Sequence, residues 1–214
     1  MSSKTEISNI ALSHLGIGKE ISNLDTERSD EANACRRFYT ICKETVLRDH
    51  DWPFAKKNIL LSLIEENPTS EWAYSYTYPP DCLMIRKILS GIRTDTRQSR
   101  VEFQIAYGDS SAIVLCDLDE AEAQYTVNVS DSNRFPSDFV MCMSHKLAAM
   151  IAPRLTAGDP FKLGIKNEQM YQMYLKISAA NAYNEEQLPQ EVESSFVRYR
   201  EGDSDGDEKP KIIR

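Results

Sequence analysis

Several marks of secreted and membrane proteins are missing from this 214-residue chain. No apolar run approaches the length needed to cross a bilayer, so we expect no membrane-spanning helix. The first residues, Met-Ser-Ser-Lys-Thr-Glu, contain no apolar stretch, so we expect no signal peptide. The five cysteines are odd in number and form no C-x-x-C pair. We therefore expect reduced, mostly structural thiols, as in a protein made in the cytoplasm.

Basic residues are too few for a protein that grips DNA. The chain has 25 Lys and Arg against 33 Asp and Glu, a formal net charge of -8. Proteins that bind duplex DNA through its phosphates normally carry a basic excess, so this balance disfavours general DNA affinity. An acidic protein can still surround DNA and let it slide, because its charge repels the phosphates. The apolar content of 41% allows one ordinary globular domain with its own core.

Common enzyme motifs are missing as well. The sequence contains no G-x-G-x-x-G, no phosphate-binding G-x-x-x-x-G-K-[ST], no G-x-S-x-G and no H-E-x-x-H. The three histidines, His14, His50 and His145, are far apart and lack the spacing of metal ligands, so zinc is not expected. We therefore expect no catalytic residue, no cofactor and no metal site.

One acidic run keeps an enzymatic alternative open. Asp117, Asp119, Glu120 and Glu122 could coordinate Mg²⁺ or Ca²⁺ in a metal-dependent hydrolase or nuclease. The run lacks the glycine turn and the twelfth-position Glu of an EF-hand loop, which favours a solvated acidic loop. Hydrolytic activity that is lost when Asp117 and Asp119 are replaced by Ala would support the enzyme instead.

Helical periodicity marks both ends of the chain. Apolar residues at spacings of three and four predict helices over about 4–15 and 30–49, the second preceded by the cap Ser29. The same period returns after residue 136, in a helix that Pro153 should kink or end. A last helix is expected from about 160 to 185.

The second helix should end in the stretch Arg48-Asp-His-Asp-Trp-Pro-Phe. Pro53 disfavours helical geometry for the residue before it and interrupts the hydrogen-bond ladder. Trp52 and Phe54 flank this break, and we expect both rings to pin the corner onto the helices. A catalytic His50 between two aspartates is the alternative, but no nucleophile lies near it in the sequence.

Between the helical regions the periodicity changes to two. An apolar run occupies 58–64, and alternating residues predict strands over about 72–78, 101–107, 112–116 and 125–129. The first of these four strands puts aromatic rings on one face: Trp72, Tyr74, Tyr76 and Tyr78. Such a row could stack the bases of a single-stranded nucleic acid. No basic residue lies between positions 71 and 85, so a packed or subunit-contacting face is favoured.

Together these patterns predict an α+β fold. We expect a mainly helical bundle with an inserted small antiparallel β-sheet and an extended C-terminal tail. The bundle should comprise 1–57 and 136–186, the β-rich insertion 58–135 and the tail 187–214.

The acidic tail cannot bury enough apolar area to fold alone. It nevertheless contains apolar residues that a partner could cover: Phe196, Val197, Tyr199, Ile212 and Ile213. Main-chain pairing with a sheet edge is one route by which such a tail orders on a partner. A disordered tail that only keeps the protein soluble is the alternative.

The order of four segments is similar to a known family. They read IALSHLG, ISNLD, VLRDHDWPFAKKNILLSL and WAYSYTYPPDCLMI. Over about residues 5–90 the chain resembles the head-to-tail adaptor proteins of short-tailed bacteriophages, the tail tubular protein A family. The resemblance consists of an L-G helix end, a W-x-F element before an apolar run, and a tyrosine-rich strand ending in P-x-D. The matching residues are Leu15, Gly16, Trp52, Phe54, Tyr76, Tyr78, Pro79 and Asp81.

The resemblance implies a structural role in the virion and no enzymatic activity. It implies a homo-oligomeric ring, about a dozen copies, that sits between the portal protein and the tail nozzle protein and extends the DNA channel. Such a ring would be assembled in the host bacterial cytoplasm and found in the neck of the virion. The C-terminal tail would reach along the portal, which makes Phe196, Val197, Tyr199, Ile212 and Ile213 the expected partner-binding residues.

Overall fold

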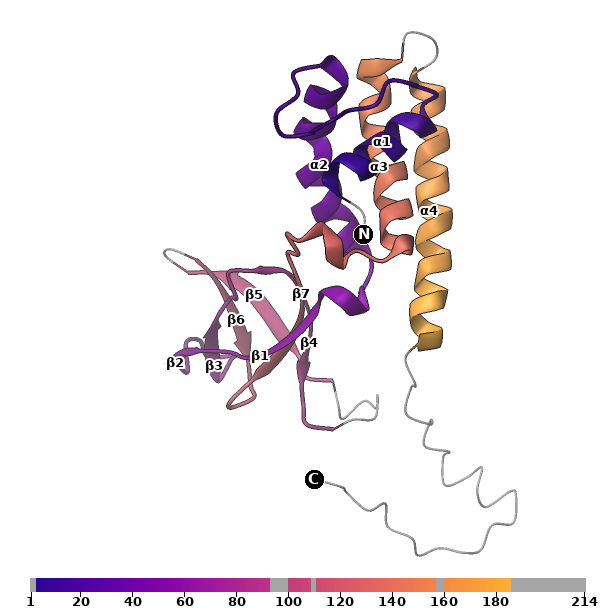
Figure 1. Cartoon of the computed structure of the whole chain (residues 1–214). Coiled ribbons are helices and arrows are strands. Elements are labelled where there is room, and N and C mark those ends of the chain that lie inside the picture. Colours follow the sequence, from indigo (N-terminus) through magenta and orange to yellow (C-terminus); the bar gives the residue numbers. More distant parts are fainter. Residues whose placement is uncertain (1–2, 93–99, 109–110, 157–159, 186–214) are drawn as a thin grey trace, which may run out of the picture.

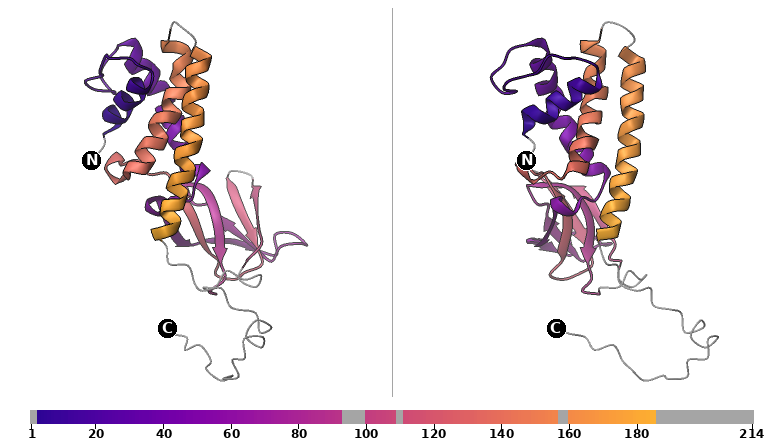
Figure 2. Two further views of the ribbon diagram at one scale, coloured as in Figure 1. Left: turned by 90° about the vertical axis from the view of Figure 1, so that its right-hand side faces the viewer. Right: turned by 45° about the vertical axis from the view of Figure 1, so that its right-hand side comes forward.

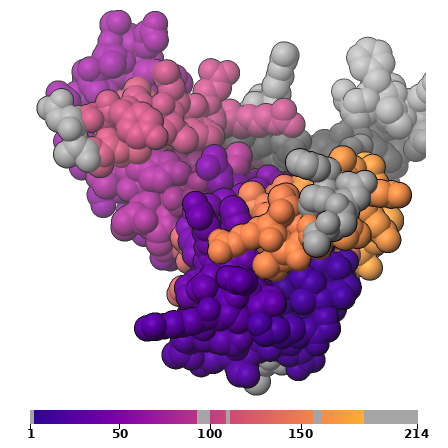
Figure 3. All heavy atoms as spheres, turned by 90° about the horizontal axis from the view of Figure 1, so that it is seen from above, coloured from indigo at the N-terminus to yellow at the C-terminus, as the bar shows by residue number. Residues whose placement is uncertain are grey.

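The computed structural model describes residues 3–92, 100–108, 111–156 and 160–185. These residues form a helical part and a β part, which adjoin at one end of the helices (Figure 1, Figure 2). Seen along the helices from above, the strands project to one side of them (Figure 3). The protein therefore presents an elongated, two-part outline and not a single round body.

Four α-helices make up the helical part among the described residues. The central helix is α3 (Ser137–Leu155), and α1 (Lys4–His14), α2 (Asp30–Asp49) and α4 (Pro160–Glu185) pack against it. All four begin and end close to the bounds that the periodicity predicts. None of the described helices is long and apolar enough to span a bilayer.

Local sequence explains where the helices start and stop. Ser3 and Glu6 form a capping box at the start of α1, and the Ser29 hydroxyl accepts a bond from the Ala32 N–H at the start of α2. Pro153 lies inside α3 and does not end it at once, because the helix continues to Leu155.

The predicted corner after α2 is confirmed. Trp52 is only 2% exposed, and its indole N–H donates to the carbonyl oxygen of Val46 at 2.7 Å. The rings of Trp52 and Phe54 each lie edge-on to Phe139 of α3, with centroids 5.1 Å apart. A short 3-10 turn, η1 (Pro53–Ala55), then leads the chain into the first strand. The aromatic rings thus hold the point at which the chain leaves the helical part.

Seven strands lie in the described part of the region between α2 and α3. They are β1 (Lys56–Leu60), β2 (Leu63–Glu66), β3 (Tyr74–Thr77), β4 (Cys82–Leu89), β5 (Phe103–Tyr107), β6 (Ala112–Cys116) and β7 (Glu122–Val127). One antiparallel sheet has the order β1-β7-β4, and the other has the order β2-β3-β6-β5. A second 3-10 turn, η3 (Ser132–Arg134), returns the chain to α3.

The two sheets join into a barrel because one segment belongs to both. Beyond β1, the Leu61 N–H donates to Ala121 on one side at 2.9 Å. The next carbonyl, that of Ser62, accepts from the Thr77 N–H at 2.9 Å. Successive residues of a strand point their backbone groups to opposite edges, so β7 and β3 flank this segment from its two sides. A single bridge between Ile88 and Val101 links β4 to the start of β5.

The expectation of a mainly helical bundle with one small sheet is therefore wrong. The β part has two antiparallel sheets and a hydrophobic core of its own, with Tyr76, Val114, Cys116 and Tyr125 inside it. Alternating residues predict β3, β5, β6 and half of β7, but not β4 or the division of the 58–64 run into β1 and β2. The closure of the barrel depends on the change of edge at Leu61, which leaves no mark in the periodicity of the sequence.

Arg86 of β4 connects the two parts. Its guanidinium Nη2 donates to the carbonyl oxygens of Leu47, Arg48 and His50 at 2.7–3.0 Å, where α2 ends. Its Nε donates to the hydroxyl of Thr126 on β7 at 2.8 Å. The last carbonyls of a helix lack partners within the helix, and a cation satisfies them well. The barrel is thereby fixed to the end of α2.

All five cysteines are free, and four of them are buried. Burial raises the pKa of the Cys42 thiol to about 12, so this thiol is uncharged and inert at neutral pH. The prediction of unpaired, mostly structural thiols is confirmed.

Candidate assembly surfaces

The first candidate surface lies on the outside of the barrel. Four apolar side chains of β1 and β2 are exposed, and we call them the β1–β2 patch: Ile59, Leu60, Leu63 and Ile64. Leu60 is 60% exposed and Ile64 is 53% exposed. Single exposed apolar residues are ordinary, but four within the six positions 59–64 are unusual, and exposed apolar groups that gather on a soluble protein often mark a contact site.

Acidic groups surround one end of the β1–β2 patch. Glu65 and Glu66 follow it directly on β2, and Glu71 lies in the turn that leads to β3; all three are exposed. At the other end, Lys57 is paired with Asp81, whose carboxylate lies 2.8 Å from the ammonium group. The net charge beside the patch is thus negative at its β2 end.

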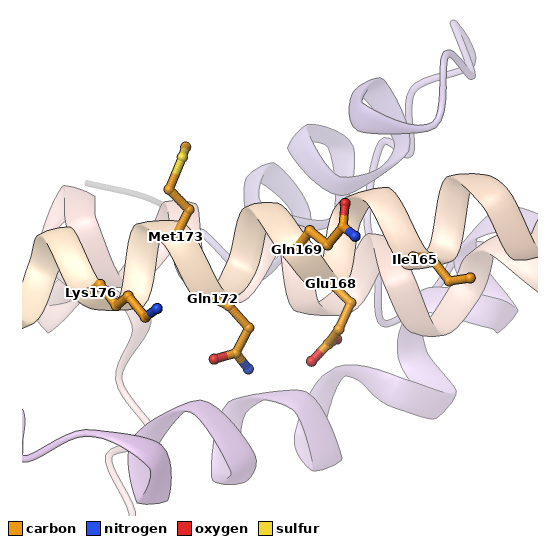
Figure 4. A pocket seen from close by; sticks show the side chains of 6 residues that line it. All are labelled: Ile165, Glu168, Gln169, Gln172, Met173 and Lys176. Carbon is orange, nitrogen blue, oxygen red and sulfur yellow. The ribbon is translucent and has the colours of Figure 1, made fainter.

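The second candidate surface is the outer face of α4. Ile165, Met173, Ile177 and Tyr183 are exposed on this helix, Ile165 by 60% and Met173 by 46%. A shallow groove on this face is lined entirely by side chains of α4, including Ile165 and Met173 (Figure 4). Because one helix supplies the whole lining, the groove is an open docking surface and not an enclosed ligand cavity.

The residues of α4 explain why this face is free. Asn167, Tyr171 and Ser178 are buried, and they recur at helical spacing on the side packed against α3. Tyr171 also donates from its hydroxyl to the carboxylate of Asp49 at 2.5 Å, which ties α4 to the end of α2. The apolar residues of the outer face lie off this stripe and remain exposed within the helical part.

The outer face of α4 is basic, in contrast to the net charge of the chain. Lys166 and Lys176 are both exposed there. Glu168 is the acidic residue of α4 nearest to them, and its carboxylate is 2.8 Å from the ammonium of Lys146 on α3. Its charge is therefore already compensated within the bundle, which leaves the lysines to set the sign of this surface.

The aromatic row is placed mainly inside the barrel. Tyr76 is buried, and its hydroxyl donates to the carbonyl oxygen of Leu118 at 2.8 Å. Tyr74 and Tyr78 are half-buried against the same core, and the indole N–H of Trp72 donates to the Gln104 side chain at 3.1 Å. The interpretation of this row as a packed face is thus confirmed for its three tyrosines.

The predicted partner-binding residues cannot be placed. Phe196, Val197, Tyr199, Ile212 and Ile213 lie outside the described residues. The basic segment 91–100, which contains Arg93, Arg97 and Arg100, also lies largely outside them. Arg86, which precedes that segment in the sequence, is in the junction between barrel and bundle.

The acidic run does not form a recognisable metal site. Asp117 accepts a bond from the Ala73 N–H at 2.9 Å, and Asp119 accepts one from the Glu120 N–H at 2.9 Å. Among the residues that the structure describes, no group of three or more His, Cys, Asp or Glu side chains is placed to hold a metal ion. These carboxylates therefore stabilise turns of the barrel.

His50 adjoins a cleft of about 180 Å³ between the corner after α2 and the end of α4. The imidazole lies edge-on to Trp52, with centroids 4.9 Å apart. The carboxylate of Asp51 in the same cleft is 3.3 Å from the ammonium of Lys56. The charged groups beside His50 thus serve the structure of the corner.

The other two histidines meet in the helical core although 130 residues separate them. The rings of His14 and His145 are stacked with centroids 3.9 Å apart, and Tyr174 stacks on the far side of His145. Burial, and then the neighbouring His145, lowers the pKa of His14 to about 4. His14 is bonded to the Ser144 hydroxyl at 3.1 Å, and His145 to the Asn167 side chain at 3.0 Å. The stack links α1, α3 and α4.

Sequence reasoning misses both assembly surfaces. The run from 58 to 64 indicates only an apolar segment. In a strand only every second side chain can face the core, so a run with this many apolar residues must leave some of them exposed. In α4, periodicity groups Ile165 and Ile177 with the buried stripe, whereas both are exposed. A count of apolar positions on each helical face would have revealed this excess.

Neither a protein-family model nor a curated protein matches this chain. The proposal for the function therefore depends on the two exposed surfaces and on the resemblance of residues 5–90 to the adaptor family.

Proposed function

We propose that this protein is a head-to-tail adaptor of a short-tailed bacteriophage. In this role, copies of the chain form a ring in the neck of the virion, after assembly in the host bacterial cytoplasm. The ring joins the portal protein to the tail nozzle protein and continues the DNA channel. The chain acts by docking to its neighbours and catalyses no reaction.

The single observation that carries this proposal is a pair of different exposed apolar surfaces. The β1–β2 patch is on the barrel, and the outer face of α4 is on the helical part. β2 and α4 lie at opposite sides of the molecule (Figure 1). Rings are built from heterologous contacts, in which each subunit uses two different surfaces. A protein that acts alone on a small substrate would have no use for either surface.

Charge supports the same role. With a net charge of -8 per copy, a ring of many copies would repel the phosphates of DNA in its channel. DNA could then pass without being held, which is what a conduit between capsid and tail requires. The expected tail contacts, Phe196, Val197, Tyr199, Ile212 and Ile213, would supply the attachment to the portal.

Binding to the portal tests the proposal. The full-length chain, mixed with the portal ring of the same phage, should add a ring of density to one end of the portal in electron micrographs. Replacing Ile212 and Ile213 by Asp should abolish this binding and leave the far-ultraviolet circular dichroism unchanged. Ser204→Asp, which adds charge to the tail without removing an apolar group, is the control. A folded wild-type chain that never binds the portal would refute the adaptor role.

A further inference from the structure

We infer that the β1–β2 patch of one copy docks on the outer face of α4 of the next copy. This inference rests on the proposed ring and goes further, because it assigns both sides of the contact between neighbouring subunits. Each copy uses its barrel on one side and its last helix on the other. The contact is therefore heterologous and repeats from copy to copy.

Apolar complementarity is the first argument. Leu60 and Ile64 protrude from the barrel, and Ile165 and Met173 flank the shallow groove of α4. In the close-up, Met173 extends to one side of the helix and Gln172 and Lys176 extend to the other (Figure 4). An apolar side chain therefore lies along one border of the groove, and polar side chains lie along the other. Placing protruding aliphatic groups against such a groove removes apolar surface from water on both copies.

Charge complementarity also supports this contact, and it indicates that a second copy of the chain binds there. The acidic end of the β1–β2 patch carries Glu65 and Glu66, whereas the outer face of α4 carries Lys166 and Lys176. If two copies met patch to patch, the glutamates of both would face each other. If they met α4 to α4, the lysines would face each other. Only the contact between the patch and α4 brings opposite charges together, so a second copy used head to tail is favoured over a symmetric dimer.

A rigid junction between barrel and bundle is needed if repeated contacts of this kind are to close into a ring. Arg86 and the rings of Trp52 and Phe54 hold the barrel at a set angle to the helices. The two docking surfaces are therefore fixed relative to each other. If each copy is rotated by the same fixed angle relative to the last, the copies can close into a ring. A flexible junction would instead give open chains of variable length.

Exchange of charges tests the contact directly. One variant carries Glu65→Lys and Glu66→Lys, and a second carries Lys166→Glu and Lys176→Glu. In either variant alone, like charges meet at every contact, so self-association should weaken about tenfold or more, as measured by sedimentation velocity and by ring formation on the portal. In an equimolar mixture each contact again joins opposite charges, and assembly should recover with the two variants alternating. The variant with all four substitutions should also assemble alone.

Glu20→Lys combined with Glu102→Lys is the matched control, because both carboxylates are exposed elsewhere on the protein. This control should assemble like the wild type. Circular dichroism must show the native helix content for every variant, so that lost assembly reports on the surface and not on folding.

The possible outcomes separate this inference from the adaptor role. If the wild type forms rings on the portal but neither charge variant weakens them, the inference is wrong and the adaptor role stands. The same holds if both variants fail and their mixture does not recover. If the variants lose only binding to the nozzle protein, the surfaces belong to that partner and the inference is again wrong. If the wild type never assembles, alone or on the portal, both proposals are refuted.

Discussion

Replacing Arg86 by Met should uncouple the barrel from the helical bundle. The guanidinium is the central group of the junction and its side chain is only 16% exposed. Desolvation by burial lowers the pKa of Arg86, and the nearby Asp51 carboxylate opposes this shift. The group nevertheless stays protonated, because an arginine ordinarily keeps its charge at all accessible pH values. Met is similar in length and apolar, so the substitution removes the hydrogen bonds and keeps most of the contacts.

The magnitude follows from the groups that lose their partner. Three carbonyl oxygens at the end of α2 lie within 3.0 Å of Nη2, and the Asp51 carboxylate lies 3.8 Å from Nε. Hydrogen bonds to a charged group contribute about 1.5–3 kcal/mol each, although they are not additive. Removing one partner of a buried charged network typically costs about 3–5 kcal/mol. We expect Arg86→Met to lower the free energy of unfolding by about that amount.

Urea denaturation followed by circular dichroism measures the loss, and hydrogen exchange by mass spectrometry separates the two parts. In the wild type, peptides from α2 and from β7 should become unprotected at the same urea concentration. In Arg86→Met they should do so at different concentrations. Arg37→Met, an exposed arginine of α2, is the control and should change the free energy by less than about 0.5 kcal/mol. A loss below about 1 kcal/mol with coincident transitions would refute the central role of Arg86.

Three further predictions concern the helical part. The pKa of His14 is lowered from its ordinary value of 6.5 to about 4 in the folded chain, so between these pH values the unfolded chain binds one more proton. The free energy of unfolding should therefore fall by roughly 2 kcal/mol as the pH drops from 6.5 to 4. His14→Gln should flatten this pH dependence in urea titrations. Gly16 has φ +74°, so Gly16→Ala should cost about 1 kcal/mol, whereas Gly18→Ala, in open space with an ordinary backbone, should be neutral by the same measurement. Trp52→Phe removes the donor to Val46 and should cost about 1–3 kcal/mol in chemical denaturation.

The elements that the sequence predicts well are those whose signals are local. Apolar spacing locates the four helices, Ser29 locates the start of α2, and the Trp52–Phe54 corner follows from a proline between two large rings. Alternation likewise locates β3, β5, β6 and the second half of β7. Each of these features depends on residues a few positions apart, where periodicity and capping chemistry act directly.

The features that could not be predicted depend on contacts between distant residues. Arg86 comes a few positions before the basic segment 91–100 in the sequence, and nothing around it there indicates that it reaches carbonyls 36–39 positions earlier. His14 and His145 are stacked because α1 and α3 pack together, not because of their spacing. The expected partner-binding residues of the tail, 196–213, stay a prediction because they lie outside the described residues.

The local structure of β2 also explains how an apolar patch can remain on a soluble subunit before assembly. The register between β2 and β3 shifts between Leu63 and Glu65, and Asn67, just beyond the strand, has φ 53°. Irregular edges of this kind resist the addition of another strand, and flanking carboxylates such as Glu65 and Glu66 oppose the stacking of identical patches. Backbone pairing between copies is thus discouraged while the apolar side chains stay accessible. A partner surface that offers apolar groups together with positive charge satisfies the patch, and within the described residues the outer face of α4 combines the two.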